Sequence, residues 1–228
     1  DLEERVLHWS PSTITVRLED ITLLPDQDGD EPAGDHADEP VVMYMGNLER
    51  YQGIDLLLEA FQLVSSRTPE ACLVIIGGSD SDIARYQKTA RAMGIEGKTS
   101  FLGPKPLSEM RSHFNKARIL VSPRIQGRNT PMKIYSYLDS GKPLLATNLP
   151  THTQVLDPEI AYLVPPTAEG MAEGIEVLLK GKDLRETLAR RAKERVRQEY
   201  CFEAYQRKLI NFYAQIESKI VAHEGRTL

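Results

Sequence analysis

Three cationic side chains gather around the start of one predicted helix, in the stretch SPRIQGRNTPMKIYSYLDSGKPLLAT. Arg124 and Arg128 precede the helix, and Lys133 falls in its first turn. A helix amino end carries a partial positive charge, so each exposed cation there costs roughly 0.3–1 kcal/mol. A bound phosphate would reverse that sign, because backbone N–H groups and cations would both face it. The alternative is that the three side chains extend into solvent at small cost.

Boundary signals place this helix at 131–140. Pro131 suits the first helical position, where its missing N–H would be unpaired in any case. Thr130 is then the expected N-cap, with Asn129 just outside the helix. Gly141 suits the left-handed residue that closes a helix. The stretch therefore predicts a compact strand–helix–strand unit with its cations at the strand-to-helix turn.

Other strand ends carry weaker signals. Gly46 permits close approach of the backbone after the first strand, and Gly53 opens a helix. Gly77 and Gly78 follow the second strand without the third glycine of a dinucleotide fingerprint, which favours a plain tight turn. His152 follows a later strand, where it would either line a site or lie on the surface at a helix start.

Short apolar runs alternate with amphipathic helical patterns along most of the chain. This alternation predicts an α/β fold with a Rossmann-like, doubly wound parallel sheet. Ligands of such sheets bind beyond the carboxyl ends of the strands, so the loops of interest are 46–53, 77–82, 103–107, 123–131 and 148–153. The expected strands are 41–45, 72–76, 99–102, 118–122, 143–147 and 161–164.

Charge is spread unevenly over the 228 residues. The run 26–39 holds seven acidic residues and no basic one, and leaving it out changes the formal charge from -5 to +2. The remainder lacks the strong basic excess of a nucleic-acid-binding protein. No apolar run is long enough to cross a bilayer. Two cysteines without metal-ligand spacing fit a reducing compartment, so we expect a cytoplasmic protein.

The order of motifs resembles a known family. VVMYMGNLERYQGIDLLLEAF, CLVIIGGSDSDIARYQKTARAMGI, TSFLGPKPLSEMRSHFNKARILVSP and NTPMKIYSYLDSGKPLLATNLPTHTQVL follow one another as in the C-terminal domain of GT-B-fold glycosyltransferases of family 4. The similarity covers roughly residues 41–215. It implies a donor-binding domain for a nucleoside-diphosphate sugar, with retention of configuration, no cofactor and no metal.

The resemblance also implies a domain organisation. Residues 1–25 are expected to be the tail of the connection from a missing N-terminal acceptor domain, and 26–40 an acidic linker or loop. The Rossmann-like donor domain is expected at 41–200 and a C-terminal helix at 201–228. This chain alone would then be inactive, and any membrane contact would come through the missing half.

Carried over by position, the resemblance implies two groups of site residues and no identified catalytic residue. Those expected at the diphosphate are Gly46, Asn47, Gln52, Arg124, Arg128, Asn129, Thr130 and Lys133. Those expected at the base and ribose are Gly103, Pro104, Lys105 and Ser136.

Four positions depart from the family pattern. Asn47 and Gln52 stand where the family has an arginine and a lysine, and Arg128 and Ser136 stand where it has two glutamates. One hypothesis is compensation, in which the cations before and within the helix replace those lost from the first loop. Ser136 would then bond a ribose hydroxyl more weakly than a carboxylate does.

The leading prediction is therefore the donor-binding half of a retaining glycosyltransferase, with a UDP-sugar as the default donor. The alternative is a non-catalytic module of the same fold that binds a nucleotide or a protein, which the lost charges favour. A receiver or flavodoxin-like module is a third alternative. A receiver needs an acidic pocket at the strand ends, and VVMYMGN offers no aspartate there.

Overall fold

The computed structural model describes residues 40–224, of which 217–224 are described by their backbone alone. The predicted features at 1–39 lie outside the described residues. Two compact units divide the chain, and the boundary within the described part falls between Lys193 and Glu194. The unit that ends at Lys193 contains the whole sheet.

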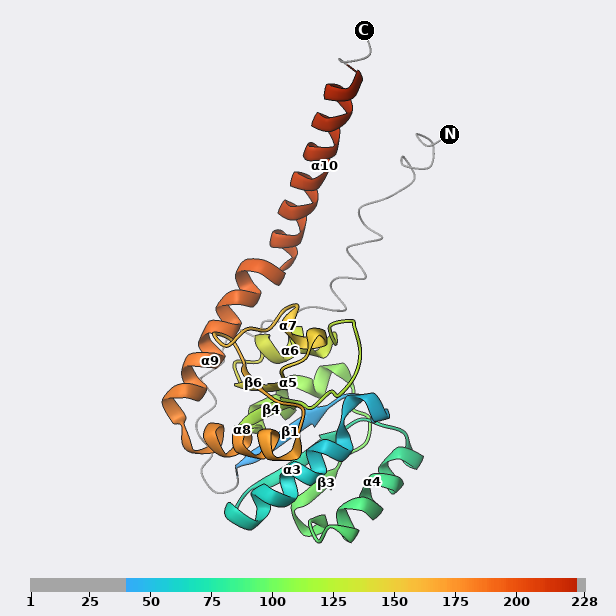
Figure 1. Cartoon of the computed structure of the whole chain (residues 1–228), viewed down its shortest axis with the longest axis vertical. Helices are drawn as coiled ribbons and strands as arrows, with labels where there is room; N and C mark the ends of the chain where they lie inside the picture. Colours follow the sequence, from blue (N-terminus) through green and yellow to red (C-terminus); the bar gives the residue numbers. More distant parts are fainter. Residues whose placement is uncertain (1–39, 225–228) are drawn as a thin grey trace. The chain divides into compact units, whose positions relative to one another are not determined.

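Six parallel strands form one sheet in the order β3-β2-β1-β4-β5-β6 (Figure 1). The predicted α/β doubly wound fold is confirmed, and every strand boundary lies within one residue of its predicted position. The strands are β1 Val41–Met45, β2 Cys72–Ile76, β3 Thr99–Phe101, β4 Ile119–Ser122, β5 Leu144–Thr147 and β6 Tyr162–Val164.

Helices connect the strands, as the alternating pattern predicts. The α-helices that begin in this unit are α3 Ile54–Arg67, α4 Asp80–Ala92, α5 Met110–Lys116, α6 Lys133–Asp139, α7 Pro150–Thr153, α8 Ala168–Lys180 and α9 Lys182–Arg195. Short 3-10 turns are η1 Arg50–Gln52, η2 Glu96–Lys98 and η3 Leu107–Glu109. The start of α4 shows why the chain turns there. Ser79 and Asp82 form a reciprocal capping box that satisfies two free N–H groups.

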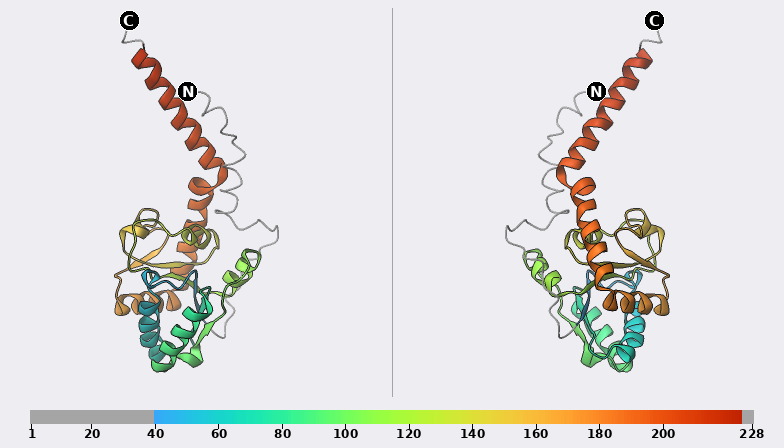
Figure 2. Two further views of the ribbon diagram at one scale, coloured as in Figure 1. Left: turned by 90° about the vertical axis from the view of Figure 1, so that its right-hand side faces the viewer. Right: turned by 90° about the vertical axis from the view of Figure 1, so that its left-hand side faces the viewer.

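The core occupies both faces of the sheet. On one face α3 and α8 pack side by side, and α3 buries Leu57, Phe61 and Val64 completely. The opposite face is covered by α5 and α6, and Figure 2 shows α5 on the side away from α3 and α8. Phe114 of α5 and Tyr137 of α6 meet edge to face there, with ring centroids 5.5 Å apart. Each fully buried apolar side chain contributes roughly 1.5–3 kcal/mol.

The helix that carries the cations begins later than predicted. It starts at Lys133, follows Met132 and has no side-chain cap, so Pro131 is not its first residue and Thr130 is not its N-cap. The carbonyl of Pro131 instead accepts from Ile134 N in a preceding turn. Thr130 could not cap this start, because its hydroxyl is directed to another residue, Gln154. The predicted left-handed residue after the helix is confirmed at Gly141, where φ is 73°.

Strand order reverses between β1 and β4. The chain moves outward from β1 through β2 to β3, then returns to the other side of β1 for β4. In sheets of this kind the two connections leave in opposite directions, and ligands bind in a crevice at this point, which here lies beyond the carboxyl ends of β1 and β4. This crevice is bordered by the loops 46–53 and 123–132, which contain most of the residues expected at the diphosphate.

The second unit is helical in its described part. It contains the end of α9, a π-helical turn η4 Val196–Tyr200 and α10 Phe202–Glu224. Lys208 Nζ donates to the carbonyl of Glu199 at 3.0 Å, which joins α10 to the turn. Exposed apolar side chains on α10 are Ile210, Phe212, Tyr213 and Ile216. No helix in residues 40–224 has the length and apolar character needed to span a bilayer.

Gly53 provides a test of how tightly the two crevice loops meet. Its φ is 76°, and a Cβ atom there would overlap the carbonyl oxygen of Pro123. Gly94 has a similar φ of 70° but open space around it, so it serves as a matched control. We expect Gly94→Ala to lower the free energy of unfolding by roughly 1 kcal/mol. Gly53→Ala should lower it by about 3 kcal/mol or more.

Urea unfolding of both variants measures the difference. Equal destabilisation would show that the loop after β1 and the loop after β4 do not press against each other at this point.

Candidate functional site

A tyrosine hydroxyl fixes α6 against the end of β1. Tyr137 Oη donates to the carbonyl of Met45 at 2.9 Å and accepts from the N–H of the same residue at 2.7 Å. Burial raises the pKa of Tyr137, so the hydroxyl keeps its proton. Lys133 lies four residues before Tyr137, and residues at this spacing share one face of a helix. The tie therefore brings Lys133 to the residues that follow β1.

Lys133 reaches from α6 to the loop after β1. Its Nζ donates to Gln52 Oε1 at 3.0 Å and lies 3.9 Å from the centroid of the Tyr44 ring. A Cβ atom on Gly46 would be 3.1 Å from the same Nζ, so only glycine leaves the ammonium this room. Among the side chains described, those of residues 40–216, no carboxylate forms an ion pair with Lys133.

The electrostatics of this lysine are unfavourable without a ligand. Burial lowers the pKa of Lys133 well below its ordinary value, and the positive charge of Arg124 lowers it further. An amide oxygen and an aromatic face compensate an ammonium only in part. An anion placed beside Lys133 would restore the charged form. The crevice is thus prepared for negative charge.

Hydrogen bonds hold the first loop in shape. Tyr44 Oη donates to the carbonyl of Asn47 at 2.6 Å. The side chain of Asn47 is exposed and donates to Tyr51 Oη at 3.5 Å. Tyr51 also accepts, through its carbonyl, from the N–H of Ile125 at 3.0 Å. The loop after β1 and the loop after β4 therefore form one hydrogen-bonded wall.

Arg124 serves its own loop as well as the crevice. Its Nε donates to the carbonyl of Gln126 at 2.8 Å and its Nη1 to that of Asn129 at 2.9 Å. The guanidinium stacks on Tyr51, 4.9 Å from the ring centroid. Two of its five N–H donors are therefore used to fold the loop. The charge and the remaining donors stay at the site.

Short helix α7 holds the other residues expected at the diphosphate. Thr151 Oγ1 donates to the carbonyl of Asn129 at 2.7 Å, and Gln154 Nε2, just after α7, donates to that of Arg128 at 2.6 Å. Thr130 Oγ1 lies 3.5 Å from Gln154 Oε1. The backbone at 128–130 is thereby fixed, while the Arg128 side chain remains exposed.

His152 is buried completely, so its interpretation as a surface residue is wrong. Its Nδ1 is 2.8 Å from the carbonyl of Thr147, which requires Nδ1 to carry the hydrogen. Its Nε2 then accepts from Ser122 Oγ at 2.9 Å. Thr147 Oγ1 donates in turn to the carbonyl of Arg124 at 2.6 Å. The imidazole thus joins the ends of β4 and β5 and, through Thr147, the loop 123–132, which we call the arginine loop.

Residues expected at the base and ribose lie farther along the same edge. The carbonyl of Gly103 accepts from Gly77 N at 2.8 Å, which connects the end of β3 to the end of β2. Pro104 and Lys105 are exposed beside it. Ser136 is partly buried on α6 and makes no hydrogen bond with the described residues. The structure thus brings Gly46, Gln52 and Lys133 together directly. The residues expected at the base, 103–105, follow β3, which lies two strands away from β1.

Sequence reasoning missed the aromatic contributions to the site. Tyr44 and Tyr51 supply the rings beneath Lys133 and Arg124, and Tyr137 supplies the tie to β1. Tyr137 is buried like an ordinary core residue, and its hydroxyl has this second role. The spacing of four residues between Lys133 and Tyr137 could have indicated that the two side chains share one face of the helix.

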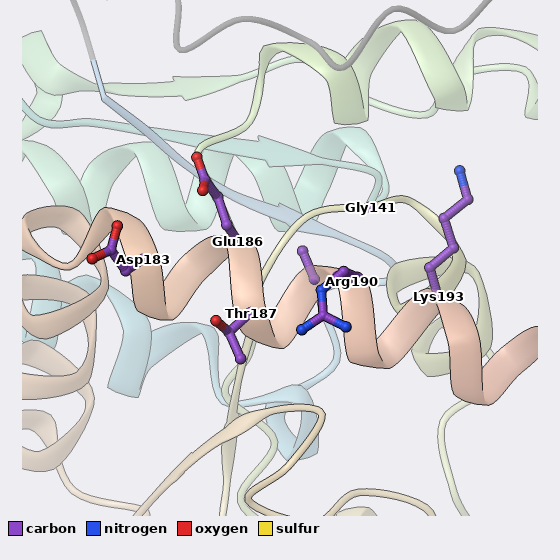
Figure 3. A pocket seen from close by; sticks show the side chains of 7 residues that line it. Gly141, Asp183, Glu186, Thr187, Arg190 and Lys193 are labelled. Carbon is purple, nitrogen blue, oxygen red and sulfur yellow. The ribbon is translucent and has the colours of Figure 1, made fainter.

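A separate groove of about 610 Å³ lies along α9. It is lined by Gly141, Asp183, Glu186, Thr187, Ala189, Arg190 and Lys193. Figure 3 shows side chains from successive turns of α9, with Glu186 and Lys193 pointing to one side. Its acids and bases are mixed, and Gly141 precedes β5, so the groove is remote from the carboxyl ends of the strands. Nowhere in the described residues do three His, Cys, Asp or Glu side chains form a group suited to a metal.

Comparison with known families agrees with this architecture. The sequence profile of the family described as "Glycosyl transferases group 1" matches residues 27–195, which is well over half of the chain. The chain belongs to this family. The GT-B assignment made from the sequence is confirmed, and the single six-stranded sheet agrees with it.

This group 1 chain resembles the D-inositol 3-phosphate glycosyltransferase of Corynebacterium aurimucosum, with 27% identity over 187 residues. That match covers 78% of this chain and 44% of the relative. The chain thus spans less than half the length of this curated relative.

Solved structures share the fold. Sucrose-phosphate synthase from Thermosynechococcus elongatus aligns with a TM-score of 0.67 and 23% identity, covering 83% of this chain and 47% of that one. HepE from Anabaena, solved in complex with UDP and glucose, aligns with a TM-score of 0.69 and 15% identity, covering 90% and 53%.

The buried histidine predicts a specific loss of stability in acid. Burial lowers the pKa of His152 from 6.5 to about 4. Between these values the unfolded chain binds a proton that the folded chain excludes, so stability present above pH 6.5 is lost as pH falls toward about 4. The expected loss from this residue is roughly 3 kcal/mol.

Urea unfolding at a series of pH values measures this loss. His152→Asn should be less stable at neutral pH and should lack this part of the acid dependence. Ser122→Ala removes the partner of Nε2 but keeps the imidazole, so it should retain a pH-dependent loss. An unchanged acid slope in His152→Asn would contradict the assignment.

Proposed function

We propose that this chain is the donor-binding half of a retaining glycosyltransferase that uses a nucleoside-diphosphate sugar, with UDP as the nucleotide. One observation carries the proposal. The ammonium of Lys133 lies at the reversal point of strand order, beside Gly46 and Gln52, with no carboxylate of residues 40–216 to pair with it. A diphosphate is the anion that such a crevice suits.

The chemistry follows from the position of that charge. In the transfer step the bond between the anomeric carbon and the diphosphate oxygen breaks, while an acceptor oxygen bonds to the same face of the sugar and its proton passes to the departing diphosphate oxygen. Negative charge grows on the departing diphosphate. Lys133, Arg124 and the backbone N–H groups of the loops would stabilise that charge without rearranging. No side chain of this chain is assigned as a general base.

The contact between Lys133 and Gln52 supports the compensation hypothesis. Gln52 stands where the family resemblance implies a lysine, and its amide oxygen receives the ammonium from α6. A cation therefore still reaches this side of the crevice, although it comes from the opposite wall. Ser136 would face the ribose as a neutral hydrogen-bonding group.

Related structures support the choice of nucleotide. HepE has been solved with UDP and glucose and with UDP-glucose, and it shares this fold. Because the present chain spans only 44% of its curated relative, complete transfer would also need an acceptor domain. Alone, the chain would bind donor and transfer little sugar.

A second candidate function is a non-catalytic module that binds a nucleotide or a protein. The observation in its favour is that Arg128 and Ser136 replace two carboxylates expected from the family. The two functions differ in whether a sugar nucleotide binds at Lys133 and is turned over when an acceptor domain is present.

The first test is Lys133→Met, which keeps the length of the side chain and removes the charge. We expect UDP to bind roughly 10–100-fold more weakly, because a charge-assisted hydrogen bond worth about 1.5–3 kcal/mol is lost. Lys88→Met on the exposed face of α4 is the matched control and should bind as the wild type does. Calorimetry with UDP, GDP and ADP measures the affinities and the base preference.

Equal affinities in Lys133→Met and the wild type would remove Lys133 from the diphosphate site. A wild-type chain that binds none of the three nucleotides would favour the second candidate function as a protein-binding module.

A second test uses the lowered pKa of Lys133. A bound diphosphate should raise this pKa toward its ordinary value of 10.5, so binding should take up protons at pH values between the two. We expect an uptake of at most about one proton per UDP-glucose, present only at pH values above the lowered pKa of Lys133 and below 10.5.

Calorimetric titrations in buffers with different ionisation enthalpies measure the uptake. Lys133→Met should bind without it. Proton release, or heats independent of the buffer in the wild type, would contradict an ammonium that gains its charge on binding.

A further inference from the structure

The crevice carries more positive charge than a diphosphate needs. A nucleoside-diphosphate sugar with a neutral sugar has two negative charges on its diphosphate at neutral pH. Lys133 and Arg124 already match these charges, since Arg124 lies close enough to Lys133 to perturb its titration. Arg128 is a third cation on the same wall, and the loop 123–132 contains no acidic residue.

The backbone of Arg128 lies beside the guanidinium of Arg124, which is expected at the diphosphate. The guanidinium of Arg124 donates to the carbonyl of Asn129, and a Cβ atom on Gly127 would lie 2.6 Å from Arg124 Nη2. The two residues that flank Arg128 therefore both contact the Arg124 guanidinium. A long side chain that starts here can reach a group attached to the diphosphate.

The backbone around Arg128 is held and its side chain is not. Gln154 Nε2 binds the carbonyl of Arg128 at 2.6 Å, and Thr151 Oγ1 binds that of Asn129 at 2.7 Å. The Arg128 side chain is exposed, and none of the acidic side chains described in residues 40–216 forms an ion pair with it. Its anchor is thus rigid, while its five donors remain available for a ligand.

We propose, as a deepening of the proposed function and resting on it, that the transferred sugar carries a carboxylate. The donor would be a nucleoside-diphosphate uronic acid, and Arg128 would bind the sugar carboxylate. Arginine presents a planar fork that matches a carboxylate with two parallel hydrogen bonds. A neutral hexose leaves one cation of this wall without a counter-charge, and a uronic acid supplies it.

A uronic acid donor would also account for an arginine at position 128, where the family resemblance implies a glutamate. Hydroxyl groups of a neutral sugar donate hydrogen bonds readily to a carboxylate, whereas an arginine has donors and no acceptor. Arg128 in place of the expected glutamate therefore changes the preferred partner from a hydroxyl to an anionic oxygen.

Two donors that differ at one carbon test the proposal. UDP-glucuronate has a carboxylate at C6 where UDP-glucose has a hydroxymethyl group. We expect calorimetry with the 228-residue chain to show UDP-glucuronate binding about 10-fold or more tightly. Arg128→Gln should abolish this preference, because it weakens the binding of UDP-glucuronate more than that of UDP-glucose. Arg91→Gln, on the exposed face of α4, should retain the preference.

The possible outcomes distinguish a failure of the uronic acid inference from a failure of the proposed uridine donor site. Equal binding of both donors by the wild type would overturn the uronic acid inference and leave the proposed donor site standing. A preference for UDP-glucuronate that persists in Arg128→Gln would overturn the role of Arg128. Binding of neither donor would overturn the proposed uridine donor site, and the inference with it.

Discussion

The tie between Tyr137 and Met45 is the contact on which the candidate site depends. One hydroxyl satisfies both backbone groups of the last residue of β1 and so fixes the distance between that strand and α6. Lys133 lies one helical turn away and inherits its position from this tie. The two walls of the crevice, one from each half of the sheet, are therefore held together before any ligand arrives.

The crevice stores an electrostatic conflict that ligand binding would resolve. The folded chain places an ammonium beside a tyrosine ring, an amide oxygen and a second cation, and the loss of hydration depresses its pKa. Packing of the core around α3 and α8 offsets such a local cost. Unfavourable groups are retained at binding sites because a ligand of opposite charge converts the cost into affinity.

Much of the fold could be predicted from the sequence, because apolar periodicity directly reflects burial. The strands at 41–45 and 72–76 were predicted residue for residue. The predicted start of α6 was wrong. Pro131 and Thr130 satisfy the local rules for a helix start, but in the structure the hydroxyl of Thr130 contacts Gln154. A partner 24 residues away cannot be found from local propensity.

For the candidate site, the sequence could indicate which loops lie together but not which of their side chains touch. Family resemblance and loop order named the residues around Lys133, yet the sequence could not show that Gln52 would receive its ammonium. His152 illustrates the same limit. A polar residue after a strand usually lies on the surface, but Ser122 and Thr147 pair with both of its ring nitrogens and make its burial possible.

Helix α7 and the residue after it hold the backbone of the arginine loop from a later part of the chain. Thr151 and Gln154 hold the carbonyls of Asn129 and Arg128, and neither contact depends on the side chains of those two loop residues. The loop can therefore exchange side chains while its path stays constant. In evolutionary terms, ligand preference and loop architecture can vary separately, which makes this wall of the crevice a place where new ligand specificities can arise without refolding.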